Sequence, residues 1–495
     1  MRGPVKTCLV HIAYRILPVF MADYVPTIGL EIHAELRTKT KMFCNSKNDP
    51  DETRPNVNVC PICMGFPGTL PVANREAVHH VLRVGAAVNG ALADYTEFDR
   101  KNYFYPDLPK GYQISQYEFP LVSGGTLANV ALTRIHLEED AARSQHDQDA
   151  HFSLVDFNRA GLPLMELVTE PVIHDAKTAS FFAEELQRLL RALGAGEANM
   201  EKGQMRVEAN ISISNSDALG TKVEVKNINS FRAVEKAIAY EVKRQKELLE
   251  KGEKVVQETR GWDEAKQKTF SQRVKEGSAD YRYFPDPDIP KFQLSRIPEF
   301  TKEEIQKTLP ELPWQKRERY LSLGLKAVDT ETLVADEAYA VFFDDEIVGR
   351  TTDAERIRLG ANYLLSEIRG RAPAPEALAR LADGVFAEVL GLIADKKLTS
   401  RGAKDLLGVL LEKGGKPEAL AADMGIIQIQ DAGYVLKLSD ELIAEHANVA
   451  HDVRSGKIEA LKFLVGQGMK KSKGAANPAE LEKALMEKLE VGSLQ

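Results

Sequence analysis

TIGLEIHAEL, from Thr27 to Leu36, alternates strictly between two kinds of side chain. Apolar residues stand at every even position, and Gly29, Glu31, His33 and Glu35 stand at the odd ones. Successive side chains of a strand point to opposite faces, so the pattern predicts a half-buried β-strand. Its polar face presents carboxylates with an imidazole between them. Such a row favours a hard metal ion or acid–base chemistry, and the alternative is a solvated sheet face.

Length and composition narrow the class of protein. A chain of 495 residues, 43% hydrophobic and 28% charged, is typical of a soluble globular protein with about three domains. No run of roughly eighteen apolar residues occurs, so we expect no membrane partner. Four cysteines, three of them in one short stretch, favour a reducing cytoplasm over a disulfide framework. The net charge of -8 argues against indiscriminate nucleic-acid binding and leaves room for a local basic patch.

Alternation recurs at residues 206–213 and 222–226, where each strand again has one apolar and one charged face. This is typical of antiparallel sheets with one open side. Helical spacing predicts helices over 176–193, with Asp175 as the N-cap, and from Ser230 to about residue 251. The fold class is therefore predicted to be α+β.

Composition changes where prolines cluster between residues 285 and 298, and the pattern beyond is almost entirely helical. Met21 is the expected start of the folded chain. We expect an extension outside the fold at 1–23, a sheet domain at 24–295, a helical domain at 296–395 and a small helical tail at 396–495.

Two further acidic segments follow the first strand. One holds Glu138, Glu139 and Asp140, and the other places Glu166 within an apolar run. A lone carboxylate among apolar residues is costly to bury unless it is paired or binds a metal. Three strands that each present a glutamate could converge on one Mg²⁺. In the alternative interpretation, Glu166 pairs with an arginine such as Arg159 or Arg206.

Three cysteines form the pattern C-x15-C-x2-C, which resembles part of a zinc ribbon. They are Cys44, Cys60 and Cys63. A structural zinc site needs a fourth ligand. Ser46 stands where a C-x-C pair would place it, and His79 or His80 could substitute. Reduced, metal-free thiols are the alternative.

Two basic segments could contact nucleotides. Residues 100–107 interleave cations with aromatic rings, which suits stacking and phosphate pairing but also a packed aromatic corner. Between residues 454 and 477, six cations stand against the single anion Glu459, which suits a phosphate backbone or solvated helix ends. The six are Arg454, Lys457, Lys462, Lys470, Lys471 and Lys473. No Walker loop, GxGxxG motif or nucleophile pair is present.

In several long segments the chain resembles one family, the B subunit of the glutamine-dependent aspartyl/glutamyl-tRNA amidotransferase. The resemblance covers essentially everything from Tyr24 onward. The segments are IGLEIHAEL (28–36), NVCPICMGFPGTLPVAN (58–74), FDRKNYFYPDLPKGYQISQ (98–116), HLEEDAARS (136–144), DFNRAGLPLMELVTEP (156–171), RVEANISI (206–213), EVKNINSF (224–231), RVKEGSADYRYFPDPDIP (273–290) and FLVGQGMKKSKGAANP (463–478).

The resemblance implies a cradle-shaped catalytic domain with an antiparallel sheet and flanking helices, then an all-helical domain and a small tail that binds tRNA. It also implies a heterotrimer with an amidase A subunit and a small C subunit. The expected substrates are Glu-tRNA(Gln), Asp-tRNA(Asn) or both. The expected cofactors are ATP and Mg²⁺, which serve to phosphorylate the side-chain carboxylate before ammonia displaces the phosphate.

The resemblance also implies roles for particular residues. The catalytic and Mg²⁺-binding set is Glu31, His33, Glu139 and Glu166. Lys101 and Lys110 are expected near the ammonia route or the phosphates, and Arg273, Lys275 and Arg282 as anion contacts. The residues expected to bind tRNA are Lys462, Lys470, Lys471 and Lys473.

One departure from the family pattern concerns zinc. Members with a zinc site carry C-x-C where this chain has Cys44-Asn45-Ser46, so zinc is not expected. Three alternatives compete with the leading interpretation. The archaeal-type E subunit is disfavoured because no inserted domain precedes the helical part. The others are a non-catalytic tRNA-binding scaffold and an unrelated Mg²⁺-dependent hydrolase.

Overall fold

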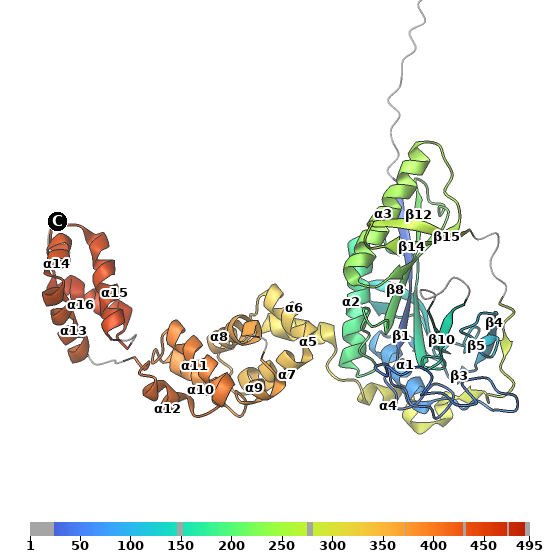
Figure 1. Ribbon diagram of the computed structural model, residues 1–495, viewed down its shortest axis with the longest axis horizontal. Coiled ribbons are helices and arrows are strands. Elements are labelled where there is room, and N and C mark those ends of the chain that lie inside the picture. The colour runs from blue at the N-terminus through green and yellow to red at the C-terminus, as the bar shows by residue number, and fades with distance from the viewer. Residues whose placement is uncertain are drawn as a thin grey trace, which may run out of the picture. The chain divides into compact units, whose positions relative to one another are not determined.

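The computed structural model describes residues 24–145, 152–274, 281–371, 373–428, 432–472 and 475–490. These form two compact units, divided after Leu312 (Figure 1). The extension expected at residues 1–23 lies outside the described residues. None of the described helices is long and apolar enough to cross a membrane.

A ten-stranded sheet forms the centre of the first unit. β1 (Val25–Glu35) lies between β11 (Pro163–Thr169) and β12 (Met205–Ser214), and both neighbours run antiparallel to it. β8 (Val130–Glu139) pairs with β11, and β13 (Val223–Ile228) pairs with β12. The alternating stretch at residues 27–36 thus lies in β1, in the middle of the sheet.

The remaining strands complete this sheet and form three small ones. They are β2 (Ala91–Leu92), β3 (Tyr95–Thr96), β4 (Asp99–Asn102), β5 (Tyr112–Ser115), β6 (Val122–Ser123), β7 (Thr126–Leu127), β9 (Arg143–Gln145), β10 (Leu154–Asp156), β14 (Glu258–Asp263), β15 (Lys268–Val274), β16 (Phe284–Pro285) and β17 (Phe292–Gln293). The main order is β15-β14-β13-β12-β1-β11-β8-β6-β2, with β7 beside β8. The α+β class is confirmed, but the sheet is mixed because β13 and β14 pair in parallel.

Three helices cover the apolar face of the sheet. α1 (Arg75–Ala87) contacts β8, α2 (Ala176–Ala192) contacts β1, and α3 (Phe231–Glu250) contacts β12 and β13 (Figure 1). Ile28, Leu30, Ile32 and Ala34 of β1 point into this layer and are buried. Both predicted N-caps are confirmed: the carboxylate of Asp175 accepts from the Thr178 amide, and the Ser230 hydroxyl caps α3.

The second unit is helical and contains two separate cores. Its α-helices are α5 (Pro313–Ser322), α6 (Ala327–Ala335), α7 (Glu337–Phe343), α8 (Ala354–Tyr363), α9 (Pro375–Ala379), α10 (Val385–Ala394), α11 (Ser400–Lys413), α12 (Pro417–Asp423), α13 (Ala432–Glu445), α14 (Ala447–Arg454), α15 (Leu461–Lys471) and α16 (Pro478–Lys488). One core extends from Tyr320 to Ala421, and the other from Val435 to Leu489.

The expected domain boundaries differ from these cores at two places. The division expected at residue 395 falls inside the first helical core, because α11 and α12 pack on α10. The division expected at residue 295 falls before a segment that belongs to the first unit. In that segment α4 (Lys302–Lys307) packs on α1, and the Arg83 guanidinium donates to the Thr308 carbonyl at 2.9 Å.

A buried histidine on α1 makes the stability of the first unit depend on pH. Nε2 of His80 lies 2.9 Å from the Arg37 carbonyl oxygen, and its Nδ1 has no hydrogen-bond partner among the described residues. Burial lowers the pKa of His80 below the ordinary 6.5. Below that pH the unfolded chain binds a proton that the folded chain does not, so acid removes stability.

We therefore expect His80 to lower the free energy of unfolding by up to about 1.4 kcal/mol for each pH unit below the pKa that it has in the unfolded chain. His80→Gln keeps a donor for the Arg37 carbonyl but does not titrate. Urea unfolding at about pH 7.5 and at about pH 5.5 should show a smaller acid-induced loss in the variant than in the wild type. Equal losses in the two proteins would contradict the expectation.

Candidate active site

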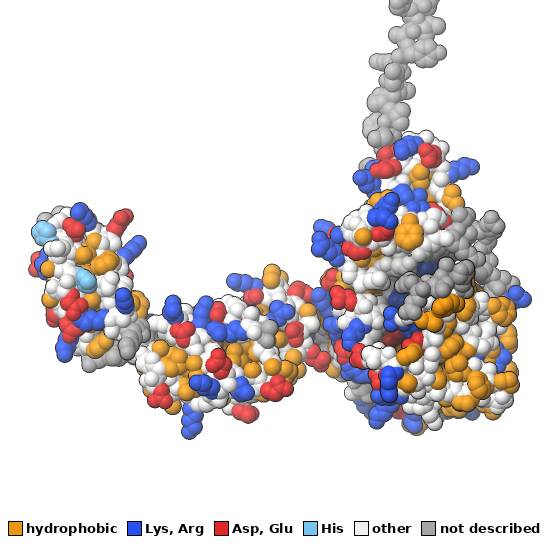
Figure 2. Space-filling view, viewed as in Figure 1, with side chains coloured by type: hydrophobic (Ala, Val, Ile, Leu, Met, Phe, Trp, Pro, Cys, Tyr) orange, Lys and Arg blue, Asp and Glu red, His pale blue; other side chains and the backbone are white. Residues whose placement is uncertain are grey.

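The polar face of the sheet is the floor of a depression of about 420 Å³. β1, β8, β11, β12 and β13 supply the floor, and Lys101 of β4 with Tyr281 and Tyr283 lines its side. Acidic and basic side chains are visible inside this hollow (Figure 2). Glu31 and His33 of the predicted polar row therefore line a cavity and do not lie on an open solvated surface.

Three potential ligands meet where β1, β11 and β8 adjoin. His33 stands opposite Glu166 in one strand pair, and Glu166 stands opposite His136 in the next. His33 Nε2 lies 3.3 Å from Glu166 Oε2 and 3.6 Å from Glu138 Oε1, and His136 Nε2 lies 3.3 Å from Glu166 Oε2. One ligand atom each from His33, Glu138 and Glu166 lies within 4.8 Å of the others. We call these three residues the histidine cluster.

The electrostatics of the histidine cluster favour positive charge. Burial disfavours protonated His33, but its hydrogen bond to Glu166 and the charges of Glu166, Glu138 and Glu208 outweigh burial and raise the pKa of His33 to about 9. Burial likewise disfavours ionised Glu166, but His136 and His33 hold its pKa well below the ordinary range. The described side chains thus stabilise Glu166 as a carboxylate and attract a cation.

A second set, the carboxylate cluster, lies next to the first. It consists of Glu31, Glu208 and Glu224, with one oxygen of each within 4.8 Å of the others. Glu31 pairs in register with Glu208 across β1 and β12, and Asn210 donates to Glu31 Oε1 at 2.8 Å. Lys226 Nζ lies 2.7 Å from Glu208 Oε2 and 3.6 Å from Glu224 Oε1, so this set already attracts one cationic group.

Both clusters fit a hard divalent cation by the chemistry of their donors. The carboxylate cluster offers only oxygen, the donor that Mg²⁺ prefers, and the histidine cluster adds one imidazole nitrogen when His33 is deprotonated. Asn210 Oδ1 and His33 Nδ1 are buried and have no hydrogen-bond partner among the described residues. Of the expected ligand set, Glu31, His33 and Glu166 lie in this depression.

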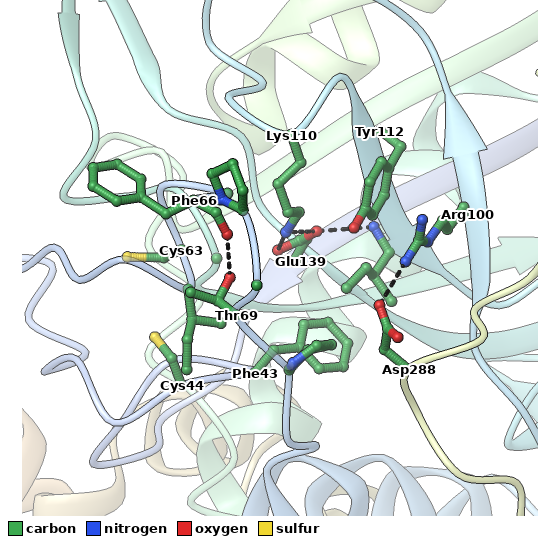
Figure 3. A pocket seen from close by; sticks show the side chains of 17 residues that line it. Phe43, Cys44, Cys63, Phe66, Thr69, Arg100, Lys110, Tyr112, Glu139 and Asp288 are labelled. Atoms are coloured by element: carbon green, nitrogen blue, oxygen red, sulfur yellow. Dashed lines mark hydrogen bonds and ion pairs between the residues drawn. The ribbon is translucent and has the colours of Figure 1, made fainter.

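Glu139, which was expected in the ligand set, does not line this depression. Its neighbour Glu138 does. Neighbouring residues of a strand point to opposite faces, so Glu138 of β8 faces the depression while Glu139 faces away. Glu139 lines a second cavity, of about 260 Å³, where Lys110 binds both of its carboxylate oxygens and the Ile114 amide donates to Oε1 at 2.9 Å. Figure 3 shows this pair with Tyr112 and Arg100 beside it.

The two lysines expected near the ammonia route or the phosphates therefore line different cavities. Lys101 reaches into the depression, and its Nζ lies 5.1 Å from the centre of the Tyr281 ring. Burial opposes its charge, but Glu138, Tyr283 and Glu166 outweigh burial and raise the pKa of Lys101. It is a cation beside the histidine cluster. Lys110 lies with Glu139 in the second cavity.

The ion pairs expected in the alternative interpretation of Glu166 do not form. Arg159 instead contacts Asp140 at 2.5 Å and Glu35 at 3.2 Å, and Arg206 contacts Asp140 at 3.0 Å. The two guanidinium groups hold the pKa of Asp140 low against its burial. Glu166 has histidines as partners, so the arginines neutralise a different carboxylate.

The three cysteines meet, but they do not complete a zinc site. Their sulfur atoms lie within 4.8 Å of one another. Ser46 Oγ lies 3.9 Å from Cys63 Sγ, and the histidines considered as a fourth ligand are engaged elsewhere on α1. His80 contacts the Arg37 carbonyl, and His79 stacks on Phe300. A closed structural zinc site needs four ligands, so the described residues do not fit one.

The remaining predicted contacts are dispersed. Lys462 and Lys470 are exposed on α15, whereas Lys471 pairs with Glu441 at 2.9 Å and Glu445 at 2.5 Å. Lys473 and Lys275 lie outside the described residues, as does the side chain of Arg273 on β15. Arg282 follows Tyr281 and has a φ of 45°.

The sequence-based prediction missed three carboxylates of the site. Glu208 and Glu224 stand on the charged faces of strands that alternation had already identified. Glu138 lies two residues after His136 on β8, so both side chains point to the same face of the sheet, and His136 lies opposite Glu166. Alternation within each strand could have shown that these residues lie on the polar face. It could not show which strands are neighbours in the sheet.

Two family models match the chain. The GatB/GatE catalytic domain matches residues 26–297, and the GatB domain matches residues 345–489. Among known proteins, the B subunit of the aspartyl/glutamyl-tRNA(Asn/Gln) amidotransferase of Thermus thermophilus is 44% identical, over 95% of this chain and 100% of its own length. The corresponding protein of Gloeothece citriformis is 41% identical, over 94% of this chain and 98% of its own length.

A plant protein is similarly close. The B subunit of the chloroplastic/mitochondrial glutamyl-tRNA(Gln) amidotransferase of Physcomitrium patens is 42% identical, over 94% of this chain and 85% of its own length. The similarity thus extends across both compact units. The chain belongs to the family of B subunits of the aspartyl/glutamyl-tRNA(Asn/Gln) amidotransferases.

Proposed function

We propose that this protein binds Glu-tRNA(Gln), Asp-tRNA(Asn) or both in the cytoplasm and uses ATP to phosphorylate the side-chain carboxylate of the attached amino acid. Ammonia then displaces the phosphate and leaves the amide. A carboxylate is a poor acyl electrophile, and its acyl phosphate is a good one. The activity would be that of an ATP-dependent carbon–nitrogen ligase with glutamine as the amido donor.

The adjacent histidine and carboxylate clusters are the observation that carries this proposal. Phosphoryl transfer depends mainly on positioning and on neutralising phosphate charge. The histidine cluster and the carboxylate cluster would hold Mg²⁺, which binds phosphate oxygens and offsets their charge. The two clusters bring five carboxylates together in one depression, beside cationic side chains such as Lys101 and Lys226.

The chain's own residues would bind and orient the reactants. Lys101 and Lys226 place two ammonium groups at the depression, where they can pair with phosphate oxygens. Asn210 holds Glu31 in its rotamer through the 2.8 Å hydrogen bond. Because β1 is central in the sheet, the backbone that carries Glu31 and His33 is fixed by neighbours on both sides.

The proposal includes two partner subunits. An amidase A subunit would hydrolyse glutamine, and a small C subunit would complete the heterotrimer. The second cavity, with Lys110 and Glu139, is the candidate route for ammonia toward the depression, since both cavities lie against β8. The support for partners is that the relatives are themselves named as subunits of an amidotransferase.

The proposal is tested by amide formation on Glu-tRNA(Gln) with this chain co-expressed with its A and C subunits. Ammonium chloride replaces glutamine, so the amidase step does not limit the signal. Wild type and Glu31→Gln are compared with ATP and Mg²⁺, and Asp-tRNA(Asn) is the second substrate. ATP-dependent amidation that is lost in the variant supports the proposal. Equal activity in both proteins refutes it and favours a tRNA-binding scaffold.

We also propose that α15 of the tail contacts the tRNA backbone. Replacing Lys462 and Lys470 together with alanine should weaken tRNA binding and reduce the salt dependence of log Kd by about one unit per lysine. Lys471→Ala is the matched control and should have a smaller effect, because Glu441 and Glu445 already engage that ammonium. Identical salt slopes in all three proteins would contradict the proposed contact.

A further inference from the structure

The cysteine cluster has no role in the proposed reaction, and its surroundings are unusual. Lys41 is fully buried, yet its ammonium group lies among the sulfur atoms, 3.8 Å from Cys63 Sγ. It donates to the carbonyl oxygens of Phe157 at 3.1 Å and Ala160 at 2.7 Å. Carbonyls carry no net charge and burial lowers the pKa of Lys41, so an ammonium group at this position needs an anionic neighbour.

Cys63 is positioned to supply this charge when its thiol is ionised. Its sulfur accepts a hydrogen bond from the Cys60 amide at 3.1 Å and faces the Lys41 ammonium. The hydrogen bond from Cys44 and the charge of Lys41 outweigh burial and lower the pKa of Cys63 to about 4. Thiolates react with peroxides, whereas thiols react slowly.

A second thiol stands within reach of this thiolate. Residues 60–64 form a single helical turn, in which the Met64 amide donates to the Cys60 carbonyl at 3.0 Å. The turn places Cys60 Sγ 3.8 Å from Cys63 Sγ, so a small rotation of side chains could bring the two into bonding distance. Cys63 lines the cavity of about 260 Å³ that it shares with Lys110, and Cys60 is partly exposed.

We propose that Cys60 and Cys63 form a redox-active dithiol that hydrogen peroxide converts to a disulfide. The Cys63 thiolate attacks one peroxide oxygen, the O–O bond breaks, and the departing hydroxide takes a proton to become water. The resulting Cys63 sulfenic acid is attacked by the Cys60 sulfur, the S–OH bond breaks, and a second water leaves. Two sulfur atoms lose two electrons in total, and one peroxide is reduced to two waters.

The position of the dithiol connects it to the second cavity. A Cβ atom on Gly65 would lie 2.6 Å from Lys110 Cγ, so the cysteine turn packs directly on the lysine that holds Glu139. Disulfide formation also removes the negative charge beside Lys41. We therefore expect oxidation to shift the turn and Lys110. If the proposed function holds, oxidation should also lower the amidation activity measured with ammonium chloride. Dithiothreitol should restore that activity.

The test of the dithiol uses the purified full-length complex and does not depend on activity. The reduced protein is treated with hydrogen peroxide, alkylated with iodoacetamide, digested with trypsin and analysed by mass spectrometry. Cys60 and Cys63 lie in one tryptic peptide, residues 48–75, and Cys44 lies in another. We expect the 48–75 peptide to lose two hydrogens and to escape alkylation, with full reversal by dithiothreitol.

Variants separate the dithiol from the other thiols. Cys44→Ser should still form the disulfide within the 48–75 peptide. Cys60→Ser should leave Cys63 as a sulfenic acid that dimedone captures, with no disulfide. Full alkylation after peroxide, a cross-link from Cys44 to Cys63, or a stoichiometric metal that protects the thiols would each overturn the proposal. These results stand whether or not the complex amidates tRNA.

Discussion

Glu166→Gln is expected to reduce ATP-dependent amidation by about 10³-fold, because a neutral amide replaces the carboxylate of the histidine cluster that is held ionised. A bound metal ion supplies several kcal/mol of charge stabilisation to a phosphoryl transition state, and Glu166 would help to hold that ion. The substitution keeps the size of the side chain, so the sheet should remain folded. The measurement is the rate of amide formation at saturating ammonium chloride, together with Mn²⁺ binding followed by electron paramagnetic resonance.

The chain offers a matched control for this prediction. Glu138 and Glu139 are neighbours in sequence, but only Glu138 belongs to the histidine cluster, and Glu139 lines the second cavity. Glu138→Gln should therefore weaken Mn²⁺ binding as Glu166→Gln does, and Glu139→Gln should leave it unchanged. A loss of binding in Glu139→Gln with none in Glu138→Gln would contradict this arrangement of the two side chains on β8.

Lys110→Met is expected to lower the free energy of unfolding of the first unit by about 3 kcal/mol. Lys110 and Glu139 form a largely buried pair, with 12% and 4% of their side-chain surfaces exposed. Removing the ammonium leaves a buried carboxylate that still accepts a hydrogen bond from the Ile114 amide. Urea unfolding followed by circular dichroism measures the change.

A double variant shows whether the loss of stability comes from the unpaired charge of Glu139 or from altered side-chain packing. Lys110→Met combined with Glu139→Gln removes both charges and should recover more than half of the lost stability. Lys110→Arg keeps the charge and should be close to the wild type. If the double variant is as unstable as the sum of the two single variants, the buried ion pair is not the cause.

Much of the fold follows from local patterns in the sequence. Alternation at residues 27–36 and 206–213 predicted two strands that prove to be neighbours, and N-caps at Asp175 and Ser230 predicted where two helices begin. These features depend on residues close in sequence. The parallel pairing of β13 with β14 and the extent of the first helical core depend on contacts between distant segments, which local patterns do not determine.

The candidate site was predicted only in part, because it too combines residues of one strand with residues from strands that are distant in sequence. Glu31 and His33 lie on one strand, so their shared face followed from alternation. Assigning Glu139 by motif overlooked that the adjacent Glu138 points to the other face of β8, and only the pairing of β8 with β11 shows which of the two meets Glu166. Lys41 carried no signal in the sequence, because its importance comes from burial next to Cys63.

The central claim is that the side-chain carboxylate is activated by phosphorylation, and the fate of its oxygen atoms tests this most directly. Glu-tRNA(Gln) with both side-chain carboxylate oxygens isotopically labelled is amidated by the complex with ATP and ammonium chloride. The account predicts one labelled oxygen in inorganic phosphate for each amide formed, because ammonia displaces phosphate from an acyl phosphate. Label in adenosine monophosphate, or phosphate free of label, would contradict it.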